Sequence, residues 1–267
     1  MRDLTIKKAL SLVPHLPRLD REVLLSYALG KDRVFLMAHG ETELTPIQTK
    51  RYQSSLARAL RHEPIAYIIG KKEFYGRDFF VGPGVLIPRP ETEILVEHAL
   101  KNILLITQTK KNIAVIDVGT GSGAIITSIF LSLKSHQQKN ISWFAVDNKR
   151  VALSYARKNA KQYAVNPPIR FIQSDLLSAL EKKLSTYTQV FVIANLPYLS
   201  SSLYQLTAPT VRRHEPKSAL VSGTDGLAHY RHLLKQLQTL DTARVQVSFL
   251  FEISPEQAKK LPSLCAG

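Results

Sequence analysis

An amide side chain and an aromatic ring follow a strongly apolar run in the second half of the chain. Residues 191–194 (FVIA) have the composition of a buried strand, and Asn195-Leu196-Pro197-Tyr198 ends it. An amide oxygen and a backbone carbonyl can both accept hydrogen bonds from one NH2 group, while a ring stacks on the planar group that carries it. This motif is suited to holding a planar amide or amino-aromatic nitrogen for alkylation. A loop with an Asx turn before proline is the alternative, and these residues alone do not decide.

A glycine-rich segment, DVGTGSG at 117–123, lies between a predicted strand and a predicted helix. Glycines let the backbone approach a ligand closely. Asp147 ends the next predicted strand, ISWFAVD, where a carboxylate can accept hydrogen bonds from ribose hydroxyls. Together the two features predict a nucleoside-cofactor site. A structural tight turn is the alternative, and Gly119, Gly121 and Ala124 would also fit a dinucleotide fingerprint. No lysine follows in P-loop spacing, which disfavours ATP hydrolysis.

Asp175 ends a third predicted strand, IRFIQSD, and would face the same crevice. Its carboxylate could accept a hydrogen bond from an adenine amino group. Asp is also a favoured helix N-cap, here for the predicted helix LLSALEKKL. Both roles stay open, and both could hold.

Strands and helices alternate from Asn112 onward, which predicts an α/β fold with a parallel sheet covered on both faces. Ligands of such sheets bind outside the carboxyl ends of the strands. The expected order is a strand and a helix repeated from 113 to 184, then the strand TQVFVIAN, a long polar loop, the helix GLAHYRHLLKQLQ and the strand ARVQVSFLFEI.

The first part of the chain reads as short helices. LDREVLLSYAL at 19–29 has helical apolar spacing with Gly30 as its C-cap, and Thr45 to Gln48 form a capping box with proline at the first helical position. Aromatic and β-branched residues among glycines at 73–90 predict a hairpin or linker. We therefore expect three parts: a helical domain at 1–72, a hairpin or linker at 73–90, and a cofactor-binding domain at 91–267.

Bulk properties narrow the class of protein. The 267 residues are 45% hydrophobic with a net charge of +15, and Cys265 is the only cysteine. No apolar run is long enough to span a membrane and no signal peptide is evident, so we expect a cytoplasmic protein without disulfides or a metal site. The positive charge is spread along the chain; it fits either an acidic partner such as nucleic acid or an ordinary basic surface.

These motifs, in this order, resemble the release-factor glutamine N5-methyltransferases, the PrmC/HemK family of class I S-adenosylmethionine-dependent methyltransferases. The resemblance rests on RHEPIAYIIGKKEFYG, VLIPRPETE, GTGSG, NLPY and HEPKSALVSGTDGL, with LDREVLLSYALG and HGETELT in the helical start. It covers nearly the whole chain to about Ser254. The family's sheet is Rossmann-like, and its small N-terminal domain recognises the substrate.

The resemblance implies methyl transfer from S-adenosylmethionine to the glutamine amide nitrogen in the Gly-Gly-Gln loop of peptide-chain release factors. Asn195 would bridge cofactor and substrate, the motif through Tyr198 would hold the glutamine, and no general base is evident. The implied catalytic residues are Asn195, Pro197 and Tyr198; the substrate-binding residues are Asn195, Leu196, Pro197 and Tyr198; the cofactor-binding residues are Gly119, Thr120, Gly121, Ser122, Gly123, Asp147, Asp175, Leu176 and Asn195.

The sequence departs from the family pattern in three places. Leu196 replaces the usual proline of the motif, which suits a role for its backbone carbonyl. Leu176 stands where some members carry an aromatic residue beside the adenine. The family usually continues with a helix and two closing strands after the position of Ser254, so we expect missing or shortened strands at one edge of the sheet.

Three other functions fit parts of the sequence. An adenine N6-methyltransferase acting on ribosomal RNA or DNA would share the amide–aromatic motif and suit the positive charge, although PRPETE does not belong to that group. A nicotinamide-dependent oxidoreductase would leave NLPY unexplained. A non-catalytic RNA- or ribosome-binding relative would suit a shortened sheet.

Overall fold

The computed structural model describes residues 4–109, 112–165, 169–241 and 243–261. The chain divides into two compact units, one of Met1–Lys71 with Ala208–His214 and one of Lys72–Thr207 with Glu215–Gly267. Each unit has its own hydrophobic core. None of the helices in the described ranges combines the length and the apolar character that a bilayer crossing requires.

The first unit is helical, and its ends follow the predicted capping signals. Gly30 ends one helix in the left-handed region, with φ of 67°. The Thr45 side chain and the Gln48 side chain form the predicted capping box. A cluster of buried side chains that includes Leu24 and Tyr52 fills the space between the helices. The helices are α1 (Ile6–Ser11), α2 (Arg18–Leu29), α3 (Arg33–Ala38), α4 (Pro46–Ala59), α5 (Ile65–Ile69) and, from the later segment, α12 (Pro209–His214).

Glu22 is a buried acid in this unit, and two arginines neutralise it. Its carboxylate accepts hydrogen bonds from Arg18 at 2.9 Å and from Arg33 at 2.7 Å. The hydrogen bond from Arg33 lowers the pKa of Glu22, and Arg18 adds to the effect against the opposing effect of burial. The pair of arginines therefore keeps this acid ionised inside the helical unit.

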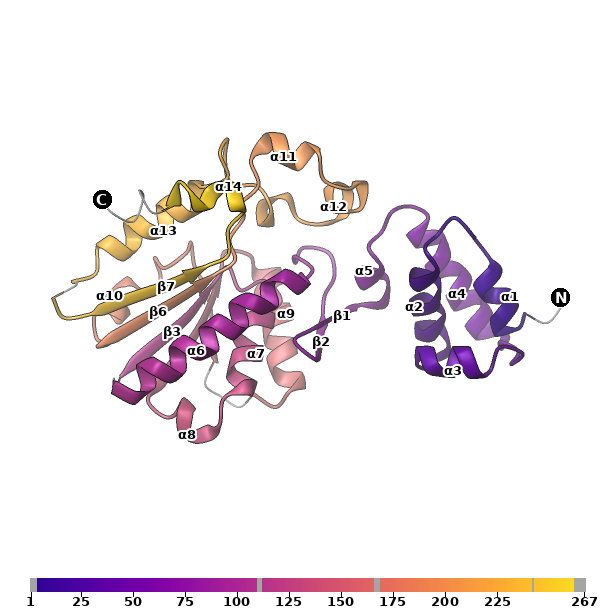
Figure 1. Ribbon diagram of the computed structural model, residues 1–267, viewed down its shortest axis with the longest axis horizontal. Helices are drawn as coiled ribbons and strands as arrows, with labels where there is room; N and C mark the ends of the chain where they lie inside the picture. Colours follow the sequence, from indigo (N-terminus) through magenta and orange to yellow (C-terminus); the bar gives the residue numbers. More distant parts are fainter. Residues whose placement is uncertain (1–3, 110–111, 166–168, 242, 262–267) are drawn as a thin grey trace. The chain divides into compact units, whose positions relative to one another are not determined.

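The second unit confirms the predicted α/β fold. Its sheet has five parallel strands in the order β5-β4-β3-β6-β7 (Figure 1). All residues of β3 and β6 are buried, which matches their near-continuous apolar sequences. In the described part of the chain, β7 forms one edge of the sheet. The strands are β3 (Ile113–Val118), β4 (Ile141–Asp147), β5 (Ile169–Gln173), β6 (Gln189–Ala194) and β7 (Gln246–Phe251).

Helices cover both faces of this sheet. Successive strand residues alternate between two hydrophobic clusters, so that Val115 faces one and Ile116 faces the other. The first cluster includes α6 and α7, and the second includes α13 (Figure 1). The helices of this unit are η1 (Pro90–Thr92), α6 (Glu93–Thr109), α7 (Ala124–Ser132), α8 (Ser135–Gln138), α9 (Arg150–Gln162), α10 (Glu181–Leu184), α11 (Ser201–Gln205), η2 (Lys217–Ala219), α13 (Ala228–Gln238) and α14 (Pro255–Ala258).

The prediction of a helix over LLSALEKKL, residues 176–184, is wrong for its first half. Only α10 at its end is helical, and Leu176 has a φ of +51°, which no right-handed helix allows. Tertiary hydrogen bonds hold the segment in its turns: the Leu177 N–H donates to the Gln236 side chain at 2.8 Å, and the Ala179 N–H donates to the Ser174 hydroxyl at 3.0 Å. These contacts outweigh the local helical preference.

A two-stranded sheet of β1 (Lys71–Phe74) and β2 (Arg77–Phe80) precedes the parallel sheet. Asn159 of α9 joins it to the glycine-rich segment, because its side chain bonds the Phe80 N–H at 2.7 Å and the Ser122 carbonyl at 2.8 Å. Asn159 is fully buried. The hairpin is thereby fixed to the loop that follows β3.

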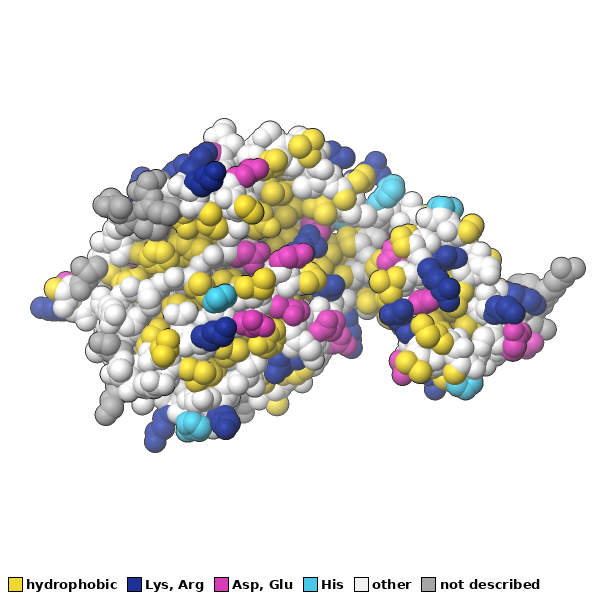
Figure 2. Space-filling model, viewed as in Figure 1, with side chains coloured by type: hydrophobic (Ala, Val, Ile, Leu, Met, Phe, Trp, Pro, Cys, Tyr) yellow, Lys and Arg dark blue, Asp and Glu magenta, His cyan; other side chains and the backbone are white. Residues whose placement is uncertain are grey.

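The surface shows two further features. In the view of Figure 2, Lys and Arg side chains occur in small separate groups rather than in one continuous patch. Hydrophobic side chains lie over the edge strand β7, where Phe249 is 39% exposed and stacks on Phe251 with ring centroids 4.7 Å apart. The described face therefore offers no single basic stripe of the kind that follows a nucleic-acid backbone.

Candidate active site

The register of the sheet brings the predicted site residues to one edge. Val118, the last residue of β3, pairs with Val146 of β4 on one side and with Ala194 of β6 on the other, so Gly119, Asp147 and Asn195 follow at the carboxyl ends of neighbouring strands. Ligands of open parallel sheets bind at this edge. Three segments that are distant in the sequence therefore form a single site.

The glycines after β3 are required by close contacts and by backbone conformation. Gly119 has a φ of +74°, and a Cβ there would lie 2.9 Å from Cδ2 of Leu196. Gly121 has a φ of +56°, and its N–H donates to the Asp147 carboxylate. Side chains at these positions would strain the loop or push it away from the motif after β6. The loop and the motif thus fit together only with glycine here.

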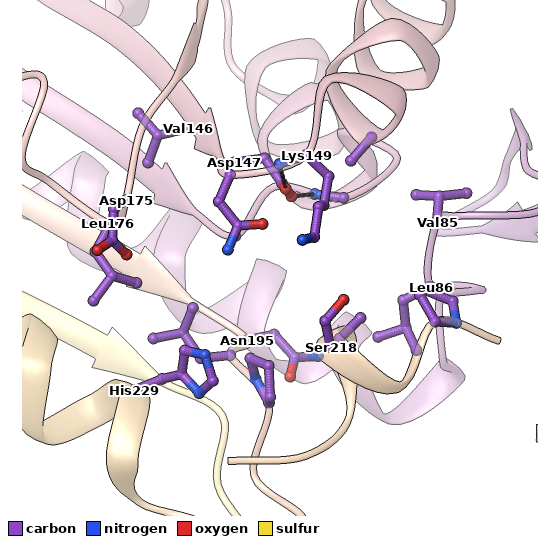
Figure 3. Close-up of a pocket in the computed structure, with 18 of the residues that line it drawn as sticks. Val85, Leu86, Val146, Asp147, Lys149, Asp175, Leu176, Asn195, Ser218 and His229 are labelled. Carbon is purple, nitrogen blue, oxygen red and sulfur yellow. Dashed lines mark hydrogen bonds between the residues drawn. The ribbon is translucent and has the colours of Figure 1, made fainter. Parts of the chain in front are cut away.

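Asp147 is fixed by the main chain on both of its oxygens. Oδ2 accepts from the Gly121 N–H at 3.0 Å and Oδ1 from the Lys149 N–H at 2.8 Å (Figure 3). Burial raises the pKa of Asp147, and these two hydrogen bonds lower it in part. A carboxylate offers roughly four lone-pair sites, so these bonds leave acceptor capacity for the hydroxyls of a ligand.

The main pocket lies at this edge of the sheet. Val146, Leu176 and Leu196 contribute apolar surface, while Asp147 and Asp175 contribute carboxylates (Figure 3). This combination of flat apolar walls and a few acceptors suits a nucleoside. The predicted residues that line this pocket are Gly119, Gly121, Asp147, Asp175, Leu176, Asn195, Leu196 and Pro197.

Asp175 lines the pocket but does not cap a helix. The short helix after it begins at Glu181 with Leu180 as its N-cap residue. The Asp175 carboxylate instead lies 4.0 Å from Nδ1 of His232. The N-cap interpretation is therefore wrong, and the ligand interpretation remains.

A second pocket adjoins the first. Both are lined by Leu86, Gly119, Gly121 and Asn195, so Asn195 stands where they meet. Of the predicted residues, Thr120 and Ser122 line only this second pocket. Two ligands that exchange a chemical group need such a junction between their pockets, because their reacting atoms must come into contact.

The motif after β6 is held from beneath by buried hydrogen bonds. The Leu196 N–H donates to the Tyr230 hydroxyl at 3.1 Å, and the Gln257 side chain donates to the Tyr198 carbonyl at 2.8 Å. Pro197 lines the main pocket, whereas Tyr198 is half-buried and lines neither pocket. Burial raises the pKa of Tyr198. The main chain of the motif is thus rigidly supported.

Gly123 lies outside both pockets. It is the N-cap of α7 with a φ of 76°, and a Cβ there would meet Ala156 of α9 at 3.0 Å. Its absence of a side chain therefore serves the packing of α7 against α9.

The carboxylate of Asp117, buried beneath the loop, accepts a hydrogen bond from the Thr120 hydroxyl at 2.7 Å. Burial raises the pKa of Asp117 to about 7.

Two loops that the sequence did not assign to the site complete the pocket. Residues 84–86 line one part of the pocket, and Pro216, Ser218 and Ala219 line another; His229 of α13 also lines it (Figure 3). Gly84 is the residue that could have indicated the first of these parts, because only glycine fits there: a Cβ would lie 2.9 Å from the Val151 side chain. Its positive φ and close packing bring this part of the pocket against α9.

An ion pair joins the two loops. Arg89 of PRPETE donates to the Glu215 carboxylate at 2.5 Å, and Glu215 also accepts from the Ile87 N–H at 3.1 Å. The Glu215 side chain is only 1% exposed. A buried acid with both partners in place fixes the HEPKSAL loop against PRPETE.

Known proteins resemble the chain over most of its length. A family model described as the PrmC N-terminal domain matches residues 7–70, and one described as a methyltransferase domain matches residues 109–206. The release factor glutamine methyltransferase of Salmonella typhimurium is 36% identical over 226 residues, which are 85% of this chain and 76% of that protein. The chain belongs to the release factor glutamine methyltransferase family.

Other members of this family cover even more of the chain. The release factor glutamine methyltransferase of Bacillus cereus is 36% identical over 244 residues, which are 90% of this chain and 82% of that protein. Among solved structures, the human Mettl16 catalytic domain in complex with the MAT2A 3′UTR hairpin 6 aligns with a TM-score of 0.48 at 17% identity, over 70% of this chain and 66% of that one. A likeness at that level carries no argument about substrate.

Proposed function

We propose that this protein transfers a methyl group from S-adenosylmethionine to a glutamine side-chain amide nitrogen in peptide-chain release factors. Membership of the release factor glutamine methyltransferase family supports this substrate. The observation that carries the proposal is the position of Asn195, which lies where the two pockets meet. We further propose that the glutamine is that of the Gly-Gly-Gln loop.

The chemistry of the main pocket fits S-adenosylmethionine. Asp147 keeps acceptor capacity for the ribose hydroxyls, Asp175 offers an acceptor for the adenine amino group, and Leu176 offers an apolar contact to the base. The glycines at 119 and 121 allow a ligand to approach the main chain closely. The cofactor, when bound, supplies an electrophilic methyl group on a sulfonium.

The protein's own contribution to methyl transfer is orientation. An amide nitrogen is a weak nucleophile because its lone pair is delocalised, so in-line placement against the methyl group matters most. We propose that the Asn195 side-chain oxygen and the Leu196 carbonyl accept the two N–H bonds of the glutamine amide. Acceptors placed there also favour the positive charge that develops on the nitrogen.

Tyr198 belongs to the same proposal in a supporting role. Gln257 fixes its carbonyl, and its half-buried ring lies at the end of the motif. We propose that the ring packs on the glutamine once the release factor is bound. In the same way, we propose that residues 1–72 recognise the release factor and that the protein works in the cytoplasm.

Incubation with labelled S-adenosylmethionine tests the function. The substrates are a release factor, its Gln→Ala variant in the Gly-Gly-Gln loop, and ribosomal RNA. Label on the unmodified release factor alone is the expected result. Label on RNA would instead favour an adenine methyltransferase, and label on none of the three would overturn catalysis.

Asn195→Ala tests the site. Loss of the acceptor should lower the rate of methyl transfer by about a hundredfold or more, as for other groups that stabilise charge in a transition state. Asn102→Ala is a matched control, because within the described ranges the Asn102 side chain bonds only the His98 carbonyl of its own helix, on the exposed surface of α6. Equal activity of the two variants would show that Asn195 does not hold the glutamine.

A further inference from the structure

The Asn195 side chain is held by a residue that lines the second pocket. Its Nδ2 donates to the Thr92 hydroxyl at 3.0 Å. Thr92 ends η1 in the PRPETE segment and is only 3% exposed. The amide that stands where the two pockets meet is therefore fixed by a residue 103 positions earlier in the chain.

A hydroxyl alone does not decide which end of an amide it faces. Thr92 can accept from the Asn195 NH2 group or donate to the Asn195 oxygen, since a hydroxyl does both. The two orientations differ by a 180° turn of the amide. Only one of them leaves the Asn195 oxygen free to accept a hydrogen bond from a ligand.

A nearby carboxylate decides the orientation. Glu252 follows β7, and its N–H donates to the Ala194 carbonyl at 3.0 Å, which places it beside Asn195. Burial raises the pKa of Glu252, and hydrogen bonds with the side chains of Thr92 and Asn195 lower it. An ionised carboxylate accepts hydrogen bonds and donates none.

The group has more acceptors than donors. Oε2 of Glu252 is buried and has no hydrogen-bond partner among the described residues. Turning the Asn195 oxygen toward this carboxylate would place another acceptor against it and remove a donor. Because unpaired buried acceptors are costly, the carboxylate form of Glu252 favours the orientation in which the NH2 group of Asn195 faces Thr92 and Glu252.

We propose that Thr92 and Glu252 are positioning residues that hold the Asn195 NH2 group inward and leave its oxygen facing the substrate. This inference rests on the proposed function for the identity of the substrate, a side-chain amide. It assigns a role to the threonine of PRPETE, which also lines the second pocket, and to the glutamate after β7.

Thr92→Val tests the proposal with little change of shape, because valine replaces the hydroxyl with a methyl group. We expect single-turnover methyl transfer to a release factor to fall about tenfold to a hundredfold, the scale of a misoriented reactant. Affinity for S-adenosylmethionine should stay nearly constant. Thr92→Ser keeps the hydroxyl and should recover most of the lost rate.

Thr127→Val is the matched control. Thr127 is a fully buried threonine of α7 whose hydroxyl has no hydrogen-bond partner in the described part of the chain. This variant makes the same chemical change without touching Asn195, and its methyl-transfer rate should equal that of the unmodified protein. A rate loss in Thr127→Val as large as that in Thr92→Val would overturn the proposal.

A double-mutant cycle shows whether Thr92 acts through Asn195. In the Asn195→Ala background, Thr92→Val should cause no additional loss, since interacting residues are not additive. Glu252→Gln should lower the rate in the unmodified background and likewise have no further effect after Asn195→Ala. Additive losses would overturn the proposal.

Nuclear magnetic resonance separates this proposal from the proposed function. The side-chain NH2 signal of Asn195 is identified by its absence in Asn195→Ala. Its hydrogen exchange should be slow in the unmodified protein and clearly faster in Thr92→Val. Fast exchange in both proteins overturns the positioning role, whether or not a release factor is methylated, whereas absence of methylation with slow exchange overturns only the proposed function.

Discussion

Removing one hydroxyl from Tyr230 should loosen the motif after β6. Tyr230 is fully buried in α13, and its ring packs against Phe251 with centroids 5.1 Å apart. Its hydroxyl accepts from the Leu196 N–H at 3.1 Å and donates to the Glu252 carbonyl at 2.5 Å. Tyr230→Phe keeps the ring and deletes both hydrogen bonds.

The size of the effect follows from the two groups left behind. The structure gives neither the Leu196 N–H nor the Glu252 carbonyl another partner within the described ranges. Each buried group without a partner costs about 1–3 kcal/mol. The Leu196 N–H is buried and the Glu252 carbonyl only partly, so the free energy of unfolding should fall by about 1–4 kcal/mol, and methyl transfer should slow because the main chain at Leu196 shifts.

Urea unfolding and amide hydrogen exchange measure these two consequences. The control is Tyr163→Phe, which deletes the hydrogen bond from an exposed hydroxyl to the Asp78 carbonyl and should cost less than about 1 kcal/mol. The Leu196 amide should exchange faster in Tyr230→Phe alone. Equal unfolding free energies for the two variants, with unchanged exchange at Leu196, would refute the reasoning.

Three further changes probe other parts of the fold. Gly226→Ala should lower the free energy of unfolding by more than about 3 kcal/mol in urea titrations, because its Cβ would lie 2.1 Å from the Tyr198 carbonyl oxygen at a φ of +78°; a normal midpoint would contradict this. Thr45→Ala should cost about 1 kcal/mol by the loss of an N-cap, with Thr45→Ser restoring it; no change in either would remove the cap's role. The buried Asp117 has a pKa of about 7 in the folded protein and 3.8 in the unfolded chain, so the folded state keeps a proton that the unfolded state has lost. The free energy of unfolding of the cofactor-free protein should therefore fall by about 4 kcal/mol between pH 4 and pH 7. Asp117→Asn should abolish this pH dependence in urea titrations, and equal slopes for the two proteins would refute the assignment.

Much of the fold could be predicted because its signals are local. Buried parallel strands are apolar on both faces, and β3 and β6 show this as uninterrupted runs. The ends of helices are also determined by residues next to them in the sequence, as the C-cap at Gly30 and the N-cap at Thr45 show. Residues at strand ends such as Asp147 could be placed at one edge because parallel strands all end there.

The parts that could not be predicted depend on contacts between distant segments. The turn at Leu176 exists because Gln236, from α13, bonds the main chain on either side of it. Nothing in the local sequence contains that hydrogen bond. The same holds for the contacts of Arg89 with Glu215 and of Asn195 with Thr92. The motifs show that these residues are present, but not that they bond to one another.

The long chain distances within the site have a consequence for biosynthesis. The helical cluster that contains Leu24 and Tyr52 uses residues from 4 to 69 alone, so a nascent chain can bury it early. The site, by contrast, joins Thr92, Asn195 and finally Glu252, which leaves the ribosome late. Closing such long loops is slow. We therefore expect each molecule to carry the folded cluster of residues 4–69 for some time before the methyl-transfer site assembles.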